Sequence, residues 1–125
     1  MKTPLPARGI YVITDDRPTG LVARVAEALS GGAAMVQYRD LTQDDARRAN
    51  EARALAQLCR RHRVPLVIDH DVALATAVDA DGVHLSQADG SPARVRAALG
   101  PDAIVGVSCY ASAALASTAA AAGAS

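Results

Sequence analysis

The sequence predicts an α/β fold in which a parallel sheet is covered by helices, with about five strand-helix units in 125 residues. Nearly continuous apolar runs alternate strictly with segments of helical periodicity, as parallel sheets require. Each run ends in polar or charged residues. Half of the residues are hydrophobic and 21% are charged, a composition typical of one globular domain.

The first unit begins with the β-branched and aromatic run IYVIT at residues 10–14. Asp15-Asp16 follow it, the pattern of a buried strand that leads into a loop. Apolar residues at helical spacing between Leu21 and Leu29 predict the first helix. Gly31-Gly32 supply the glycine that commonly ends a helix.

The second unit repeats this order. AMVQYRD at residues 34–40 is the expected strand. Thr42 and Asp45 resemble a capping box, in which a hydroxyl and a carboxylate three residues later satisfy the first backbone amides of a helix. A stripe of small residues from Ala46 to Cys59 then predicts a helix with arginines on its other face.

Three shorter units complete the chain. PLVIDHD and VALATAVDA form the third strand and helix, and GVHLSQADG is the fourth strand with a long polar exit. Ser91 and Pro92 mark a helix start, with serine as N-cap and proline at the first helical position. AIVGVSCY is the fifth strand. The alanine-rich residues 111–125 predict a fifth helix or a frayed end.

This alternation fits an open doubly wound sheet or part of a TIM (β/α)₈ barrel, and both place their sites at the carboxyl ends of the strands. The charged residues after the strands should therefore meet on one face. They include one arginine and six carboxylates, namely Arg39, Asp15, Asp16, Asp40, Asp69, Asp71 and Asp89.

Carboxylates beside an arginine suit Mg²⁺ shared with a phosphorylated ligand, because Mg²⁺ prefers oxygen ligands and guanidinium groups bind phosphate. The plainer alternative is that these acidic loops cap helices or meet solvent. A zinc site at His70 and His84 matches no familiar spacing. Ser108 and Cys109 could act as nucleophiles, although packing is their commoner role. No EF-hand, dinucleotide-binding, P-loop or nucleophile-elbow motif is present.

Composition and charge restrict the partners. Thirteen basic and thirteen acidic residues balance, which gives no reason to expect nucleic acid or an anionic membrane as partner. No segment approaches the roughly 20 apolar residues of a membrane span. Two cysteines without a C-x-x-C motif favour a reducing, cytoplasmic location. We expect residues 1–8 to be an N-terminal extension and residues 9–125 to form the domain.

Four segments resemble, in order and spacing, the first five strands of the thiamine phosphate synthase family: IYVITD, GGAAMVQYRD, PLVIDHDVALATAVDADGVHLSQAD and IVGVSCY. Q-Y-R-D and D-G-V-H-L-x-Q-x-D are the most specific parts. The resemblance implies a TIM barrel and a transferase of thiamine biosynthesis. It would join hydroxymethylpyrimidine diphosphate to a thiazole phosphate, giving thiamine phosphate and diphosphate. Mg²⁺ and cationic side chains would stabilise the leaving diphosphate without a covalent enzyme intermediate.

The resemblance also implies roles for individual residues. Gln37, Arg39 and Ser108 fall where the family holds the pyrimidine diphosphate, Asp89 where it binds Mg²⁺, and His84 in a supporting position at the pocket. Each has a plainer alternative: an ion pair with a neighbouring aspartate for Arg39, a turn for Asp89, and strand-end hydrogen bonding for Gln37 and Ser108.

The chain departs from the family pattern after the third strand. Asp69-His70-Asp71 replace the family's Asn-Asp-Asp, so Asp69 stands at a substrate-binding position and His70 at a metal-binding position. Asp69 or Asp71 could return a carboxylate to the metal, or the site could prefer a softer divalent ion than Mg²⁺. Leu41 also replaces a lysine directed at phosphate.

Length is the other departure, since a full barrel needs about 200 residues. We therefore expect the chain to be the N-terminal part of a barrel whose C-terminal part is missing, inactive alone and able to self-associate through unpaired sheet edges. Two other functions stay open. One is a thiazole tautomerase-like enzyme, against which Arg39 and Asp89 argue, and the other is a half-barrel that binds ligand without catalysis.

Overall fold

The protein is described here by a computed structural model that covers residues 2–125 and contains one five-stranded parallel sheet. The strands are β1 (Tyr11–Ile13), β2 (Met35–Tyr38), β3 (Leu66–Asp69), β4 (Gly82–Leu85) and β5 (Ile104–Val107). The helices are α1 (Leu21–Ser30), α2 (Asp45–His62), α3 (Val72–Ala77), α4 (Pro92–Leu99) and α5 (Ala113–Ala121), with a 3₁₀ turn, η1 (Gln87–Asp89). The predicted alternation of strands and helices is confirmed.

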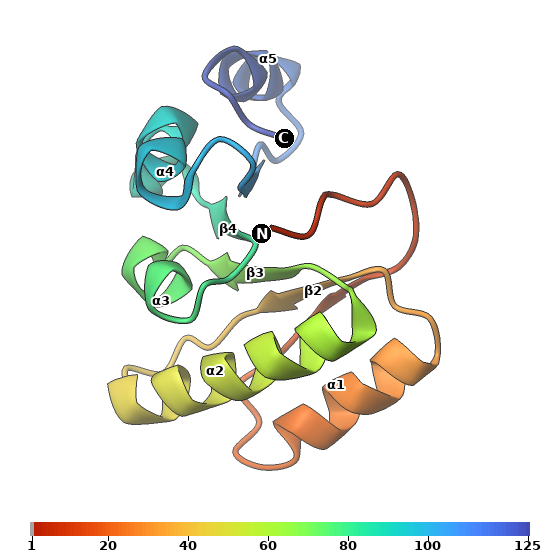
Figure 1. The fold of residues 1–125 in the computed structure, drawn as a ribbon. Helices are drawn as coiled ribbons and strands as arrows, with labels where there is room; N and C mark the ends of the chain where they lie inside the picture. The colour runs from red at the N-terminus through yellow and green to blue at the C-terminus, as the bar shows by residue number, and fades with distance from the viewer. Residues whose placement is uncertain (1) are drawn as a thin grey trace.

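The strand order decides between the two architectures that the alternation allowed. The strands lie in the order β1-β2-β3-β4-β5, and every neighbouring pair is parallel. A doubly wound sheet reverses its strand order at a switch point, and this sheet does not. The helices α1–α5 lie around the outside of the sheet (Figure 1). The architecture is therefore the wall of a (β/α) barrel.

The pleat divides the strand residues between two environments, because successive side chains point to opposite faces. One set packs beneath the helices in the main core and includes Val36, Tyr38, Leu66, Ile68, Val83, Leu85 and Val105. The other set faces the concave side, where Met35, Val67 and Ile104 form a small apolar cluster. Gln37, Asp69 and His84 continue this inner face toward the carboxyl ends of the strands.

Two sequence predictions are corrected by the structure. Residues 10–14 were expected to be a buried strand, yet Tyr11 is 39% and Ile13 54% exposed. Both residues belong to the edge strand β1. The helices cover one side of this strand, but no described residue packs over its concave side. Helix α2 is capped by Asp44, which accepts a hydrogen bond from the Arg47 amide (3.0 Å), and the proposed Thr42 and Asp45 capping box does not form.

The other helix starts follow the sequence closely. Ser91 caps α4 with Pro92 at its first turn, as predicted, and the alanine-rich segment forms α5 behind Ser112, whose hydroxyl accepts from the Leu115 amide (3.1 Å). Within residues 2–125, no helix has both the length and the apolar character needed to cross a membrane.

The N-terminal segment is tied to the opposite end of the sheet from the polar strand ends. Lys2 Nζ donates to Asp79 Oδ1 (2.7 Å) and to the Ala80 carbonyl (2.6 Å). Asp81 accepts from the Thr3 amide (2.6 Å) and from the Leu66 amide at the start of β3 (2.8 Å). This leaves the carboxyl ends of the strands free of the segment (Figure 1).

Close approach of β4 and β5 requires glycine at position 82, and this generates the first prediction. A Cβ on Gly82 would overlap the backbone carbonyl of Ile104. Gly82→Ala should therefore lower the free energy of unfolding by roughly 3 kcal/mol, since the backbones must separate. Urea denaturation measures this change. The control is Gly31→Ala at the end of α1, where the nearest atoms lie at 3.5 Å and stability should change little. Equal effects of the two substitutions would contradict the prediction.

Candidate active site

A cavity of about 570 Å³ opens at the carboxyl ends of the strands. It gathers the predicted site residues from β2, β3, β4, β5 and their following loops, with the exception of Asp71. Its lining residues are Tyr11, Ile13, Gln37, Arg39, Asp69, His70, His84, Ser86, Asp89 and Ser108. The convergence expected from the parallel sheet is therefore present.

Strand β2 presents Gln37 to the cavity in a fixed orientation. The Gln37 side chain is buried, and its Nε2 donates to the Tyr11 hydroxyl (2.8 Å). Burial raises the pKa of Tyr11, and the nearby Asp69 carboxylate raises it further against the opposing effect of the Gln37 bond. Because this hydroxyl stays protonated and accepts from Gln37, its own proton is available to a ligand.

Arg39 and Asp69 form an ion pair across neighbouring strands, with Arg39 Nε 3.5 Å from Asp69 Oδ2. The Arg39 side chain is 51% exposed, whereas that of Asp69 is 16% exposed. An exposed pair at this distance contributes little stability. It does hold the guanidinium over the cavity while leaving most of its five donors for an anionic ligand.

His84 and Ser108 meet across β4 and the end of β5, with His84 Nε2 2.9 Å from Ser108 Oγ. The imidazole occupies space that only glycine leaves open on β5, because a Cβ at Gly106 would lie 2.5 Å from His84 Nδ1. His84 therefore restrains the Ser108 hydroxyl at the cavity, while its supporting role stays a prediction.

Asp89 is held by the turn that follows β4. Its Oδ2 accepts from the Ser86 amide (2.7 Å) and from the Ser86 hydroxyl (2.8 Å), forming a capping box around η1. Both bonds use one carboxylate oxygen, so Oδ1 has lone pairs to offer a cation. Asp89 therefore forms the turn that was its plainer alternative, and it also lines the cavity.

The structure separates the three residues proposed as metal ligands. Asp71 caps α3 by accepting from the Leu74 amide (2.8 Å) and pairs with Arg48 (2.9 Å), which places it outside the cavity. His70 lines the cavity from an exposed position with a φ of 47°. Within residues 2–125, no group of three His, Cys, Asp or Glu side chains lies close enough to hold a metal ion.

A divalent ion still fits this donor set if the ligand supplies oxygens. Mg²⁺ commonly binds one or two carboxylates and completes its shell with phosphate and water. Asp89 Oδ1 accepts no hydrogen bond from residues 2–125, and Asp69 lines the same cavity. The residues thus suit an ion shared with a phosphorylated ligand and do not form a protein cage.

Three lining residues were not anticipated from the sequence: Tyr11, Ile13 and Ser86. Two of them could have been found from the period of two in β1, which puts Tyr11 and Ile13 on one face, although only the sheet shows that this face is the inner one. Ser86 shares the parity of His84 at the end of β4.

The residue after Arg39, Asp40, is a buried carboxylate. Asp40 Oδ1 accepts from the Thr42 amide (2.8 Å), and Oδ2 accepts from the Tyr38 hydroxyl (3.2 Å). Burial alone would raise the pKa of Asp40, but the bonds from Thr42 and the charge of Arg47 hold it below its ordinary value. Asp40 therefore remains an anion inside the loop that carries Arg39.

Several known proteins are similar to this chain in sequence. The family model for thiamine monophosphate synthase matches residues 10–125. Thiamine-phosphate synthase of Methylobacillus flagellatus is 50% identical over 121 residues, which are 95% of this chain and 58% of the relative. The Azoarcus sp. enzyme of that name is 52% identical over 119 residues, covering 94% and 58%.

A solved structure agrees with these sequence matches. Thiamine phosphate pyrophosphorylase from Pyrococcus furiosus superposes with a TM-score of 0.83 at 36% identity, covering 93% of this chain and 56% of that protein. The chain therefore spans somewhat more than half the length of the relatives it matches.

The lowered pKa of Asp40 predicts a pH-dependent contribution to stability. The contribution is present above the ordinary value of 3.8 and is lost as the pH falls through the folded-state pKa. Asp40→Asn should lower the free energy of unfolding at pH 7 by about 2 kcal/mol, with the difference from the unsubstituted chain shrinking toward pH 2. Urea titrations at several pH values measure it.

The matched control is Asp45→Asn, because Asp45 lies close by, at the start of α2, with an almost fully exposed side chain. Its effect should be small at every pH. A stability difference for Asp40→Asn that stays constant between pH 7 and pH 2 would refute the assignment of an ionised Asp40.

Proposed function

Because this chain belongs to the thiamine monophosphate synthase family, we propose that its cavity binds hydroxymethylpyrimidine diphosphate. The whole protein would then join this substrate to a thiazole phosphate, releasing diphosphate and thiamine phosphate. The observation that carries the proposal is one cavity that gathers a guanidinium, two carboxylates and several neutral hydrogen-bonding side chains at the carboxyl ends of the strands. That set suits a ligand with an anionic and a heteroaromatic part.

The residues divide between these two parts of the ligand. Arg39 offers a planar fork of donors to the diphosphate, with Asp69 restraining it. Gln37, Tyr11 and Ser108 supply hydrogen-bonding groups for the pyrimidine. Departure of the diphosphate leaves a cationic pyrimidine that the thiazole nitrogen captures. The protein's task is then to stabilise charge, which requires no nucleophilic side chain.

Mg²⁺ is the proposed cofactor, and when bound it would neutralise charge on the departing diphosphate. Asp89 and Asp69 are the candidate ligands. His70 stands where the family pattern has an aspartate, and an imidazole is a poor ligand for Mg²⁺. We infer a weaker Mg²⁺ affinity than an aspartate would give, or use of a softer divalent ion.

The proposal extends to the context in which the protein works. We propose a cytoplasmic enzyme whose partners are phosphorylated small molecules. The 125 residues alone would bind substrate without turnover, because the chain spans 58% of the relatives' length. Strands β1 and β5 are the sheet edges, and Ile10 and Ile13 are exposed, so self-association at high concentration is expected. Arg39 and Asp89 in the cavity argue against the tautomerase-like alternative.

Removal of the Arg39 guanidinium tests the binding role. Arg39→Met should weaken binding of inorganic diphosphate by about tenfold to a hundredfold, because it removes charge-assisted hydrogen bonds. Isothermal titration calorimetry in the presence of Mg²⁺ measures the affinity. Arg61→Met is the control, since Arg61 is exposed at the far end of α2. Equal affinities of the two variants would contradict the assignment.

Substitution of His70 tests the metal proposal. His70→Asp should lower the Mg²⁺ concentration needed for diphosphate binding, because it returns a carboxylate to the cavity rim. The positive φ at this position is one that aspartate and asparagine tolerate. His70→Asn is therefore the control that keeps the backbone and adds no charge. If the aspartate and asparagine variants show the same Mg²⁺ dependence as the unsubstituted chain, the metal proposal is wrong.

A further inference from the structure

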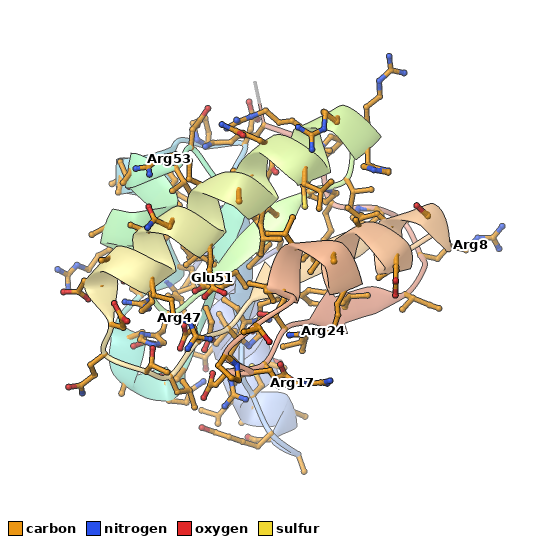
Figure 2. The ribbon with its side chains drawn as sticks, turned by 90° about the horizontal axis from the view of Figure 1, so that it is seen from below. Arg8, Arg17, Arg24, Arg47, Glu51 and Arg53 are labelled. Carbon is orange, nitrogen blue, oxygen red and sulfur yellow. The ribbon has the colours of Figure 1, made fainter. Side chains whose placement is uncertain are left out.

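Arg47 lies beside the proposed substrate site and does not line the cavity. It extends from the first turn of α2, and its side chain is 22% exposed. Its Nε donates to Glu51 Oε1 (3.0 Å) and lies 3.5 Å from Asp40 Oδ2. Figure 2 shows Arg47 and Glu51 on α2, and Arg17 and Arg24 in the neighbouring first unit.

The other arm of the Arg47 guanidinium reaches the loop after β1. Its NH2 group donates to the carbonyls of Asp16 (3.2 Å) and Arg17 (3.0 Å). One side chain thus hydrogen-bonds to the β1–α1 loop and to α2 itself, and forms an ion pair with a carboxylate of the β2–α2 loop. Lysine offers a single ammonium and cannot reproduce this planar set of contacts.

The same two loops are joined at the residue that carries the site's guanidinium. Thr14 Oγ1 accepts from the Arg39 amide (2.9 Å) and donates to the Arg39 carbonyl (3.3 Å). Asp16 Oδ1 accepts from the Leu41 amide (3.0 Å). The backbone on both sides of Asp40 is therefore hydrogen-bonded to the segment that follows β1. Arg47 holds that segment in place through its own hydrogen bonds.

We infer that Arg47 is a positioning residue, which fixes the β1–α1 loop against the β2–α2 loop and so sets where Arg39 presents its guanidinium. The predicted effect of Arg47 on ligand binding rests on the proposed function. Its predicted effect on the position of the two loops rests on the loop contacts alone. The charge of Arg47 is also needed locally, because Asp40 and Glu51 both lie against the Tyr38 hydroxyl. Without the cation, two neighbouring carboxylates would repel each other within this loop.

The test compares Arg47→Met with Arg53→Met in the full chain. Arg53 is an exposed arginine on the same helix (Figure 2), so both variants lose one charge from α2. Arg47→Lys keeps the charge and loses the planar fork. Asp16→Ala removes the second tie between the loops, and the double variant Arg47→Met with Asp16→Ala reports coupling between them.

The first readout needs no ligand. In ¹⁵N-correlated NMR spectra, Arg47→Met should shift the Arg39 backbone amide and Nε–H resonances and speed hydrogen exchange at the Leu41 amide. Arg53→Met should leave these signals in place, and Arg47→Lys should give an intermediate shift. Unchanged Arg39 and Leu41 signals in Arg47→Met would overturn the inference, whether or not the chain binds diphosphate.

The second readout is affinity for inorganic diphosphate, measured by calorimetry. Arg47→Met should weaken it severalfold, Arg53→Met should not, and the double variant should lose less than the sum of the single losses. Affinity equal to that of Arg53→Met would overturn the inference. If the unsubstituted chain binds no diphosphate, the proposed function fails while the NMR comparison still decides the role of Arg47. Should Arg47→Met fail to fold, Arg47→Lys decides both readouts.

Discussion

The register of the parallel sheet is the constraint on which the rest of this structure depends. Pairing sets Asp69 beside His84 and His84 beside Gly106, with Gln37 one strand further on, beside Val67. Because side chains alternate between faces, a slip of one residue in any strand would bury its polar residue under the helices. The same register keeps Val36, Ile68 and Val83 in the core. The same strand register therefore determines both the packing of the core and the assembly of the site.

Small residues on the inner face make this register compatible with a site. Gly82 allows β5 to approach β4, and Gly106 leaves room for the His84 imidazole beside Ser108. The concave face is thus apolar in its lower layer, at Met35, Val67 and Ile104, and polar above it.

Carboxylates that look equivalent along the chain have different roles in the fold. Asp40 is a buried anion within a loop, Asp71 caps α3 and pairs with Arg48, and Asp89 shares its turn with Ser86 at the cavity. Asp69 restrains Arg39. Each lies at or just after the end of a strand, so position in sequence does not separate them. What separates them is the amide or cation nearest each carboxylate. Asp40 and Asp89 are held by groups of their own loops, whereas the cations beside Asp69 and Asp71 come from the preceding unit.

The sequence by itself determined the five strand-helix units, the start of α4 at Ser91 and Pro92, and the set of polar strand ends, because these depend on periodicity and local capping. Resemblance to a known family added the predicted roles of Gln37, Arg39 and Ser108. Only the tertiary structure decided that β1 exposes Tyr11 and Ile13, that Asp71 is withdrawn from the cavity, and that Arg47 joins two loops. These outcomes rest on contacts between residues far apart in the chain, whose partners no local pattern specifies.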